Sequence, residues 1–307
     1  MVVKNFENYA PDLFVLLKNK AEVIVSDCAN QDFDNVPELF DESDKILMYD
    51  PFAFGGKFAP LSENLARFKN IKYIFSPYSF YDGLDLNLVK NFGIRYKNNA
   101  GANAKSVAQH ALGLALTILE KFPLLAGMKI NPDGSILGEE IFGKTAGIVG
   151  MGNIGFELYP LLLALGIKTV YFNRTKKEID LPLVSFEDIF KQDLVFLTIA
   201  ATEETRKMMV AIPSLLTKKN YLIDLSATDD LYNKKEVLRK LEREDFAGYG
   251  IELDNPNFMI PTKQCNYLAT PHMAWATVDA EKRTMRRYLE RAIKILEGKT
   301  DEIDFLV

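Results

Sequence analysis

The sequence predicts an α/β protein whose parallel sheets are covered by helices on both faces. Short, almost continuously apolar strands alternate with helical patterns along the chain, which is typical of buried parallel sheets. A glycine-rich turn joins one of these strands to a helix near the middle of the chain, and this arrangement belongs to the same class of fold. The length of 307 residues corresponds to about two domains.

Composition and charge exclude several classes of protein. Hydrophobic residues make up 48% and charged residues 26% of the chain, as in globular rather than disordered or fibrous proteins. The formal net charge of -5 provides no general attraction for nucleic acid or anionic lipid. Two cysteines (Cys28 and Cys265) and two histidines (His110 and His272) are too few for a disulfide framework or a cysteine-rich zinc module, so no metal site is expected.

The sequence also predicts where the protein is found. The N-terminal apolar run, residues 14–17, is too short for the core of a signal peptide. The most apolar stretch, around residues 161–167, is far shorter than the roughly 20 residues of a membrane span. Free cysteines without a secretory signal fit a reducing compartment, so we expect a cytoplasmic protein without membrane contact.

The first hundred residues alternate between predicted strands and predicted helices. The strands are the β-rich runs 22–26 (EVIVS), 45–49 (KILMY) and 72–75 (KYIF). The helical patterns lie near residues 9–18, 36–40 and 61–68. Ser62, shortly after Pro60, is the expected start of the third helix.

A long helix and a second βα series follow. Small and apolar residues recur at helical spacing over residues 102–122, which predicts burial against more than one surface. A loop is expected at residues 131–135. The predicted strands are 145–149, 168–172, 193–198, 221–225, 247–251 and 267–269, and the predicted helices are 154–165 and 234–244. A final helix near 278–297 carries four arginines and is expected to face solvent or another subunit.

The most informative motif is the turn Gly150-Met151-Gly152-Asn153-Ile154-Gly155. It matches G-x-G-x-x-G, follows a strand and opens a helix, which is the context that a dinucleotide site requires. Gly150 permits the tight turn, Gly152 allows the backbone to approach a pyrophosphate, and Gly155 allows close packing of helix and strand. We therefore expect residues 150–155 to bind a dinucleotide; a tight turn without a ligand is the alternative.

The residues after the next strand indicate which dinucleotide is bound. A NAD site places Asp or Glu here to accept a hydrogen bond from the ribose 2′-hydroxyl. This chain instead has Asn173-Arg174-Thr175-Lys176-Lys177, whose amide, cationic and hydroxyl groups suit a 2′-phosphate. NADP is therefore favoured, with NAD as the alternative, and a solvated basic loop would explain the same residues.

The two histidines differ in their predicted positions. His272 follows a short strand and precedes the last helix, at the carboxyl edge where ligands of such sheets bind. A lone histidine there is also compatible with a generic polar role. His110 lies inside the long helix and is expected to be structural.

Several motifs, in this order along the chain, make the sequence resemble the D-isomer-specific 2-hydroxyacid dehydrogenases. They are Asp82-Gly83-Leu84-Asp85, Asn99-Ala100-Gly101-Ala102-Asn103 with Ser106-Val107-Ala108, Gly143-Lys144-Thr145 before the glycine turn, Thr202-Glu203-Glu204-Thr205-Arg206, and Thr270-Pro271-His272. The resemblance covers most of the chain.

This resemblance implies two Rossmann-like, doubly wound domains and a homodimer. A NAD(P)-binding domain, residues 101–272, would be inserted into a flavodoxin-like substrate domain, residues 1–100 plus 273–307. The implied reaction is hydride transfer between a nicotinamide and a small 2-oxo or 2-hydroxy acid.

The resemblance also implies roles for individual residues. His272 would exchange a proton with the substrate oxygen, and backbone N–H groups at Ser79 and Phe80 would hold the substrate carboxylate. The further positions implied to contact the cofactor are Ala200, Thr205, Leu225, Ser226 and Glu252.

Two positions depart from the family pattern. Ala227 stands where the family has an arginine that clamps the substrate carboxylate, a type of group that contributes about 100- to 1000-fold in rate. Asn257 stands where the family has the glutamate that holds the histidine, with Asp254 as the alternative partner. These departures leave two hypotheses: an oxidoreductase acting on an atypical or more apolar 2-oxo acid, and a dinucleotide-binding regulatory protein with weak or no turnover.

Overall fold

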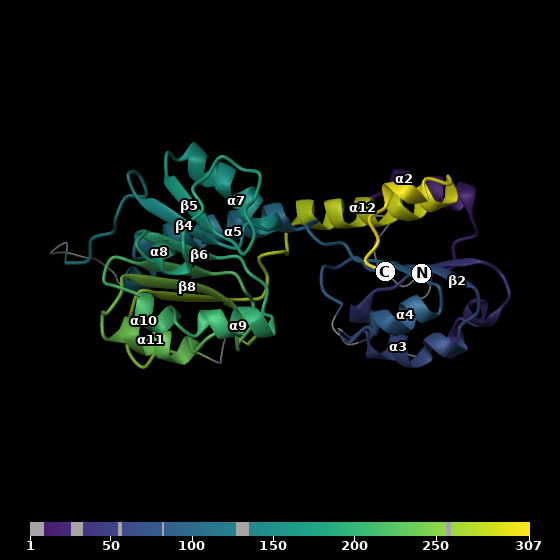
Figure 1. Ribbon diagram of the computed structural model, residues 1–307, viewed down its shortest axis with the longest axis horizontal. Coiled ribbons are helices and arrows are strands. Elements are labelled where there is room, and N and C mark those ends of the chain that lie inside the picture. Colours follow the sequence, from purple (N-terminus) through teal and green to yellow (C-terminus); the bar gives the residue numbers. More distant parts are fainter. Residues whose placement is uncertain (1–8, 26–32, 55–56, 82, 127–134, 256–258) are drawn as a thin grey trace. The chain divides into compact units, whose positions relative to one another are not determined.

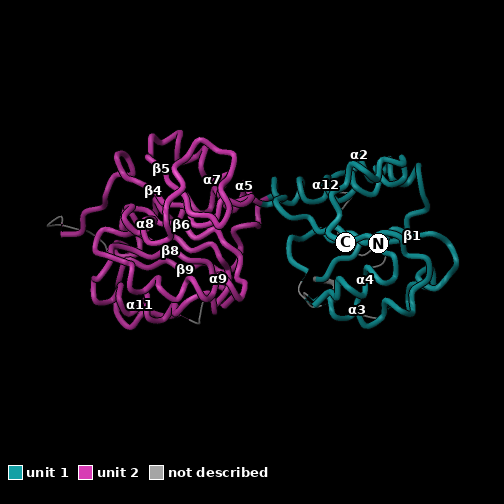
Figure 2. Tube along the Cα trace, viewed as in Figure 1, with its two compact units in different colours: residues 1–103, 278–307 teal, residues 104–277 magenta. Residues whose placement is uncertain are grey.

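The computed structural model describes residues 9–25, 33–54, 57–81, 83–126, 135–255 and 259–307. Cys28, Asp82, Asn257 and most of the expected loop at 131–135 lie outside these ranges. The chain forms two compact units (Figure 2). Unit 1 comprises Met1–Asn103 and Val278–Val307, and unit 2 comprises Ala104–Thr277, so unit 2 is inserted into the sequence of unit 1.

Unit 1 contains a parallel sheet with the strand order β1-β2-β3. Its strands are β1 (Lys45–Met48), β2 (Ile71–Phe75) and β3 (Arg95–Lys97). Its α-helices are α2 (Pro11–Lys20), α3 (Ala59–Asn64), α4 (Leu86–Asn91) and α12 (Val278–Leu296), and its 3₁₀ helices are Phe33–Asn35, Pro37–Phe40, Pro51–Phe54, Leu65–Arg67 and Thr300–Glu302.

Helices cover both faces of this sheet (Figure 1). On one face, Phe14 of α2 and Tyr288 of α12 share a buried cluster with Phe75 of β2. On the other face, Leu61 of α3 and Val89 of α4 share a second cluster with Ile74. Because neighbouring residues of a strand point to opposite faces, the adjacent Ile74 and Phe75 serve the two clusters.

The first predicted strand, residues 22–26, is wrong over the part that the structure describes. Residues 22–25 form no strand there. Residues 22–24 line a cavity beside β1 instead of pairing with it, and the side chain of Val25 is 54% exposed. An apolar run does not by itself provide a strand partner, which is why the pattern was misleading.

Two helix predictions in unit 1 also need correction. Residues 37–40 form a 3₁₀ helix, and α3 begins at Ala59 with Pro60 in its first turn, a position that proline fits well. Ser62 therefore lies inside the helix and does not start it. Its hydroxyl accepts a hydrogen bond from the Asp85 amide and donates one to the Gly83 carbonyl.

Three of the four arginines on α12 hold the chain segment 98–102, contrary to the expected exposure to solvent or a subunit. They are spaced four residues apart and so lie on one face of the helix. The bonds join Arg283 to the Ala102 carbonyl, Arg287 to the Ala100 carbonyl and Arg291 to the Asn98 carbonyl, at 3.3, 3.4 and 2.7 Å. Irregular backbone needs donors for its carbonyl groups, and these guanidinium groups supply them. The fourth, Arg286, pairs with Asp12 of α2 at 3.0 Å.

Unit 2 contains a parallel sheet with the strand order β5-β4-β6-β7-β8-β9. The strands are β4 (Thr145–Val149), β5 (Lys168–Phe172), β6 (Leu194–Leu197), β7 (Tyr221–Asp224), β8 (Gly248–Leu253) and β9 (Tyr267–Pro271). The helices are α5 (Ala104–Leu119), α6 (Phe122–Leu125), α7 (Asn153–Ala164), α8 (Phe186–Ile189), α9 (Glu203–Met209), α10 (Ile212–Leu215) and α11 (Lys234–Glu242). The predicted strands of this series match these bounds to within two residues at each end.

The sheet of unit 2 is also buried on both faces (Figure 1). α5 and α7 share one cluster with Ile148 of β4, and α8, α10 and α11 share the other with the adjacent Val149. Gly250 of β8 allows α5 to approach the sheet closely, because a Cβ atom there would lie 3.2 Å from the Leu114 side chain. α5 thus packs against both α7 and the sheet, as its composition predicted.

Candidate active site

Strand register in unit 2 brings most of the predicted site residues to one edge of the sheet. All neighbouring strands are parallel, and the ladders pair Val149 with Leu197, Leu197 with Asp224, and Leu253 with Pro271. The residues that follow these strands therefore share the carboxyl edge, where α/β sheets bind ligands. They include Gly150 after β4, Asn173 after β5, Leu225 after β7, Asp254 after β8 and His272 after β9.

The glycine turn has the geometry that its sequence predicts. Gly150 adopts φ +99°, and a Cβ atom there would lie 2.9 Å from the Thr198 carbonyl oxygen. A Cβ atom on Gly155 would lie 2.6 Å from the Gly150 carbonyl oxygen, so neither position accepts a side chain. The Thr198 hydroxyl donates to the same Gly150 oxygen at 2.7 Å and holds the turn against β6.

The space in front of this turn is open. Gly152 precedes α7 without a side-chain cap, and a Cβ atom on it would meet nothing within 4 Å. Gly152 and Asn153 are exposed and Ile154 is half-buried. The N-terminus of α7 thus presents N–H groups and the positive end of the helix dipole to a group that approaches Gly152, which suits a phosphate.

The basic segment after β5 lies beside the acidic first turn of α9. Arg174 is 61% exposed and forms an ion pair with Glu204 in the first turn of α9. The Asn173 side chain donates to the Thr175 carbonyl at 2.8 Å, and Thr175 and Lys176 are exposed. Arg174 therefore has an acidic partner that a 2′-phosphate would have to share or replace.

His272 pairs with Asp254. Because Leu253 and Pro271 are ladder partners, the next residues of β8 and β9 lie side by side, and Nδ1 of His272 is 3.0 Å from Oδ1 of Asp254. Both side chains are about half exposed or more. The acidic partner that the sequence left open is thus Asp254 among the described residues.

Three contacts fix the backbone around His272. The carboxylate of Glu252 accepts hydrogen bonds from the amides of Met273 and Ala274, at 2.9 and 2.6 Å. The Trp275 indole donates to the His272 carbonyl at 2.9 Å. His110 of α5 lies 3.1 Å from the Thr270 hydroxyl, so the second histidine supports the same segment.

Ala227, where the resemblance implies an arginine, follows β7 with φ +46°, in the left-handed region. The preceding residue, Ser226, accepts a bond from the Lys234 amine at 3.4 Å. That amine is 2.8 Å from the Asp224 carboxylate, and both side chains are fully buried. The Tyr232 hydroxyl donates to Asp224 at 2.6 Å, and burial raises the pKa of Tyr232 well above its ordinary value. Lys234 therefore pairs with Asp224 and is not available to take the place of an arginine at residue 227. No pattern in the sequence predicted that Lys234 is buried.

The remaining residues expected to contact the cofactor mostly form hydrogen bonds within the chain itself or are buried. The buried Thr205 hydroxyl donates to the Ala200 carbonyl at 2.8 Å. The Ser226 amide donates to Asp224 at 2.8 Å, and Leu225 is 6% exposed. Glu252 is 1% exposed, so its carboxylate is available mainly to its own chain.

The expected carboxylate loop belongs to unit 1. The Tyr78 carbonyl accepts a bond from the Asn99 amide at 2.8 Å, and the Ser79 carbonyl accepts one from the Asn98 side chain. The rings of Tyr78 and Phe80 stack with centroids 5.7 Å apart. Burial raises the pKa of the Tyr78 phenol, so its hydroxyl stays neutral at physiological pH.

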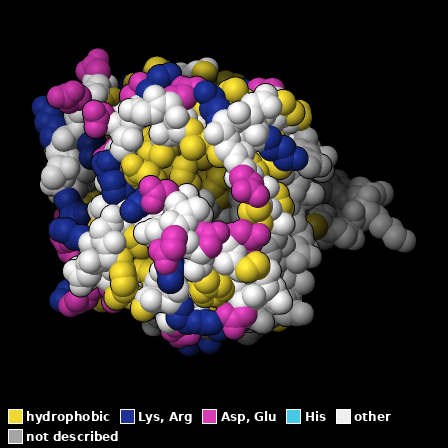
Figure 3. All heavy atoms as spheres, turned by 90° about the vertical axis from the view of Figure 1, so that its right-hand side faces the viewer, with side chains coloured by type: hydrophobic (Ala, Val, Ile, Leu, Met, Phe, Trp, Pro, Cys, Tyr) yellow, Lys and Arg dark blue, Asp and Glu magenta, His cyan; other side chains and the backbone are white. Residues whose placement is uncertain are grey.

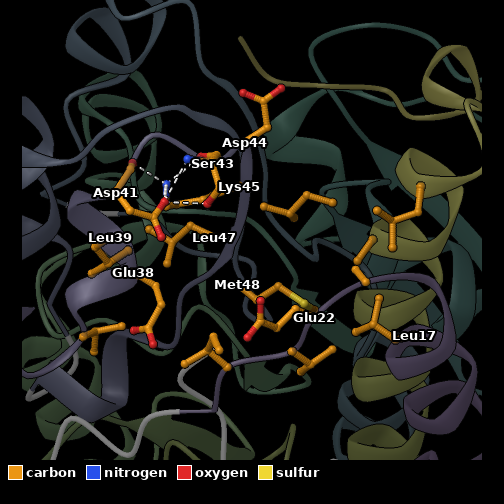
Figure 4. A pocket seen from close by; sticks show the side chains of 17 residues that line it. Leu17, Glu22, Glu38, Leu39, Asp41, Ser43, Asp44, Lys45, Leu47 and Met48 are labelled. Atoms are coloured by element: carbon orange, nitrogen blue, oxygen red, sulfur yellow. Dashed lines mark hydrogen bonds and ion pairs between the residues drawn. The ribbon is translucent and has the colours of Figure 1, made fainter.

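A separate cavity of about 310 Å³ lies in unit 1 and contains none of the predicted site residues. Apolar side chains of α2, β1 and α12 line it together with Glu22, Glu38 and Asp41 (Figure 4). The Lys45 amine bonds to Asp41 beside it. Figure 3 shows hydrophobic side chains of unit 1 in a hollow between charged ones.

The described ranges contain neither a cluster of metal-ligating side chains nor a membrane-spanning helix. No three His, Cys, Asp or Glu side chains within them gather as a metal site requires. None of the helices in that part of the chain is both long and apolar enough to cross a membrane.

Parallel sheets, the glycine turn and the polar carboxyl edge define a dinucleotide-binding α/β protein, and comparison with known proteins identifies the family. Residues 124–274 match the model of the D-isomer specific 2-hydroxyacid dehydrogenase NAD binding domain. The hydroxypyruvate reductase of Thermotoga maritima is 29% identical over 240 residues, which cover 74% of this chain and 78% of that protein. Residues 124–274 thus match the cofactor domain of the D-isomer-specific 2-hydroxyacid dehydrogenases, a family of oxidoreductases, and the chain as a whole has the fold of two Rossmann-like domains.

Solved structures agree with this fold. A D-lactate dehydrogenase from Aquifex aeolicus, complexed with NAD and lactic acid, matches with a TM-score of 0.73 and 20% identity over 99% of this chain and 97% of that one. An NADPH-dependent glyoxylate/hydroxypyruvate reductase from Sinorhizobium meliloti, in complex with NADP and malonate, matches with a TM-score of 0.69 and 21% identity over 94% and 91%. Proteins of this fold therefore include both NAD and NADP complexes.

Proposed function

We propose that this protein is an NADP-preferring oxidoreductase that transfers hydride between a nicotinamide and carbon 2 of a 2-oxo or 2-hydroxy acid. The observation that carries the proposal is the His272–Asp254 pair, 3.0 Å apart at the same sheet edge as the glycine turn. An imidazole held by a carboxylate is suited to general acid–base catalysis.

In the proposed mechanism, the bound nicotinamide supplies or accepts the hydride. His272 donates a proton to the substrate oxygen during reduction and takes it back during oxidation. Asp254 accepts a hydrogen bond from Nδ1–H of His272, which orients Nε2 toward substrate. Nε2 of His272 thus donates the proton in one direction of the reaction and accepts it in the other.

The cofactor proposal rests on the residues of the carboxyl edge. The open space at Gly152 admits a pyrophosphate on the N-terminus of α7, with Asn153 and Ile154 beside it. Asn173, Arg174, Thr175 and Lys176 would bind the 2′-phosphate of NADP, for which Arg174 exchanges its bond to Glu204. NAD, which lacks that phosphate, is the weaker alternative.

The substrate proposal follows from what replaces the arginine. Ala227 offers no charge to a carboxylate, so backbone amides at Ser79 and Phe80 would bind it alone. The stacked Tyr78 and Phe80 rings favour a 2-oxo acid with an apolar chain over glyoxylate or hydroxypyruvate. Residues 1–100 plus 273–307 would form the substrate domain and 101–272 the cofactor domain of a cytoplasmic homodimer.

A spectrophotometric screen tests this function. NADPH and NADH oxidation are followed with glyoxylate, hydroxypyruvate and 2-oxo acids of increasing chain length. We expect turnover that favours NADPH and the longer chains, and a decrease of about 100- to 10,000-fold in kcat for His272→Asn with NADPH binding retained. Cofactor binding without turnover of any 2-oxo acid would refute the proposed oxidoreductase function.

The alternative function is that of a dinucleotide-binding regulatory protein. It is favoured by one observation: Ala227 removes the substrate clamp while the buried Lys234 is held by Asp224 and cannot replace it. The same screen separates the two functions, because a regulatory protein binds NADPH and does not oxidise it.

A further inference from the structure

Glu252 carries a buried carboxylate that is turned toward its own chain. It is the penultimate residue of β8 and is 1% exposed. One of its oxygens, Oε1, accepts the amide protons of both Met273 and Ala274, at 2.9 and 2.6 Å. A buried carboxylate is costly unless hydrogen bonds compensate it, and here the compensating groups are the two amides that directly follow His272.

Strand register explains why Glu252 reaches this turn. In the β8–β9 ladder, Glu252 is the partner of Thr270, and Leu253 is the partner of Pro271. Side chains two residues apart in an extended chain point to the same side, so Glu252 and Asp254 both face the segment that leaves β9. Asp254 contacts the imidazole of His272, and Glu252 contacts the backbone immediately after it.

We propose that Glu252 is a positioning residue for His272 and not a ligand of the cofactor, the role that the family resemblance implied. The inference rests on the proposed function, in which His272 moves the proton. The two amide bonds fix the backbone direction at residues 273–274, and this direction sets where the imidazole points. With Asp254 holding Nδ1, the ring then has one orientation in which Nε2 is presented to substrate.

Two substitutions of Glu252 distinguish a positioning role from that of a general core residue. Outer partners that orient a reacting side chain typically contribute about 10- to 100-fold in activity. Gln has the same length as Glu, and its amide oxygen accepts the same two bonds, whereas Ala accepts none. The two variants therefore separate the loss of the bonds from the loss of charge.

The test compares Glu252→Ala, Glu252→Gln and the control Glu187→Gln, which changes an exposed acid on α8. We expect Glu252→Ala to lower kcat by about 10- to 100-fold, with the Kd for NADPH and the substrate KM each changed less than about threefold. Glu252→Gln should restore most of kcat, and Glu187→Gln should match the unmodified protein. A tenfold loss of NADPH affinity with kcat unchanged, or equal losses of kcat for Ala and Gln, would overturn the proposal.

Amide NMR provides a readout that needs no turnover. The Met273 and Ala274 amide protons should exchange slowly in the unmodified protein and in Glu252→Gln. They should exchange rapidly in Glu252→Ala, and if that variant fails to fold, the unmodified protein and Glu252→Gln still decide. Fast exchange in the unmodified protein would overturn the proposal. A protein that oxidises no NADPH yet shows the expected exchange would contradict the proposed function and leave the positioning contact supported.

Discussion

Ala227 stands where the family resemblance implies a charged substrate clamp. Its backbone lies in the left-handed region at φ +46°, and its methyl group leaves room for a longer side chain, since the position is half-buried. Ala227 carries no charge, and the buried amine of Lys234 is bonded to Asp224. In the proposed function, the charge available to a substrate carboxylate at this position therefore depends on the side chain of residue 227 alone.

Ala227→Arg should raise kcat/KM on glyoxylate and hydroxypyruvate by about tenfold or more, because a guanidinium binds a carboxylate through charge-assisted bonds. Steady-state kinetics measure the change. Ala227→Met is the matched control, since it adds similar length without charge and should give no gain on these acids. An unchanged or lower rate for the arginine variant would mean that Ala227 is not the clamp position.

Cys265 is the second residue with a specific expectation. Burial raises the pKa of its thiol to about 11, and only the thiolate reacts. In a Cys28→Ser background, alkylation of Cys265 by iodoacetamide should be slow at pH 7 and should rise about tenfold per pH unit up to pH 10. Mass spectrometry of quenched samples measures the rate, and a plateau near pH 8.5 would contradict the raised pKa.

At the scale of elements, the proposed preference for NADP depends on the turn after β5 and on the first turn of α9. Arg174 and Glu204 come from these two elements and form an exposed ion pair. Exposed pairs contribute little stability, about 1 kcal/mol or less, so Arg174 can exchange this partner for a phosphate.

Arg174→Ala should weaken NADPH binding about 10- to 100-fold, the contribution of hydrogen bonds between charged groups, and should change NADH binding by less than about threefold. Fluorescence titration measures both dissociation constants. Arg243→Ala, at the end of α11, is the control with no expected effect. Equal losses for the two dinucleotides would rule out contact with the 2′-phosphate.

The junction of β7 and α11 depends on a different kind of ion pair. Asp224 ends β7, Lys234 begins α11, and both side chains are fully buried at 2.8 Å. Tyr232 and Tyr249 extend this network through hydroxyl contacts of 2.6 and 2.7 Å. This pair joins the two ends of the segment 225–233, and removing either partner should destabilise the protein.

Lys234→Met should lower the free energy of unfolding by about 3–5 kcal/mol, because Asp224 is left as an unpaired buried charge. Urea denaturation followed by circular dichroism measures it. The double variant Asp224→Asn with Lys234→Met should recover part of the loss. Lys235→Met, on the same helix at an exposed position, should change stability by less than about 0.5 kcal/mol. A loss below about 1 kcal/mol for Lys234→Met would contradict a stabilising role for this ion pair.

At the scale of the whole molecule, the two units differ in how far the sequence predicted them. The strands of unit 2 were found nearly at their predicted bounds, because a strand buried on both faces is an uninterrupted apolar run. In unit 1, the run 22–26 has the same composition, and its described part forms no strand. Composition records burial and propensity, whereas a strand also needs a neighbour to complete its hydrogen bonds.

The sequence by itself determined the fold class, the family resemblance and the glycine turn, since each depends on residue types at fixed local spacing. Only the tertiary structure decided that Asp254 partners His272, that Glu252 holds the following turn, and that Lys234 is buried against Asp224. These contacts join residues 10 to 22 positions apart. They depend on which strands are neighbours and in which register, and the register pairing Leu253 with Pro271 is set by packing on both faces of the sheet and not by local sequence.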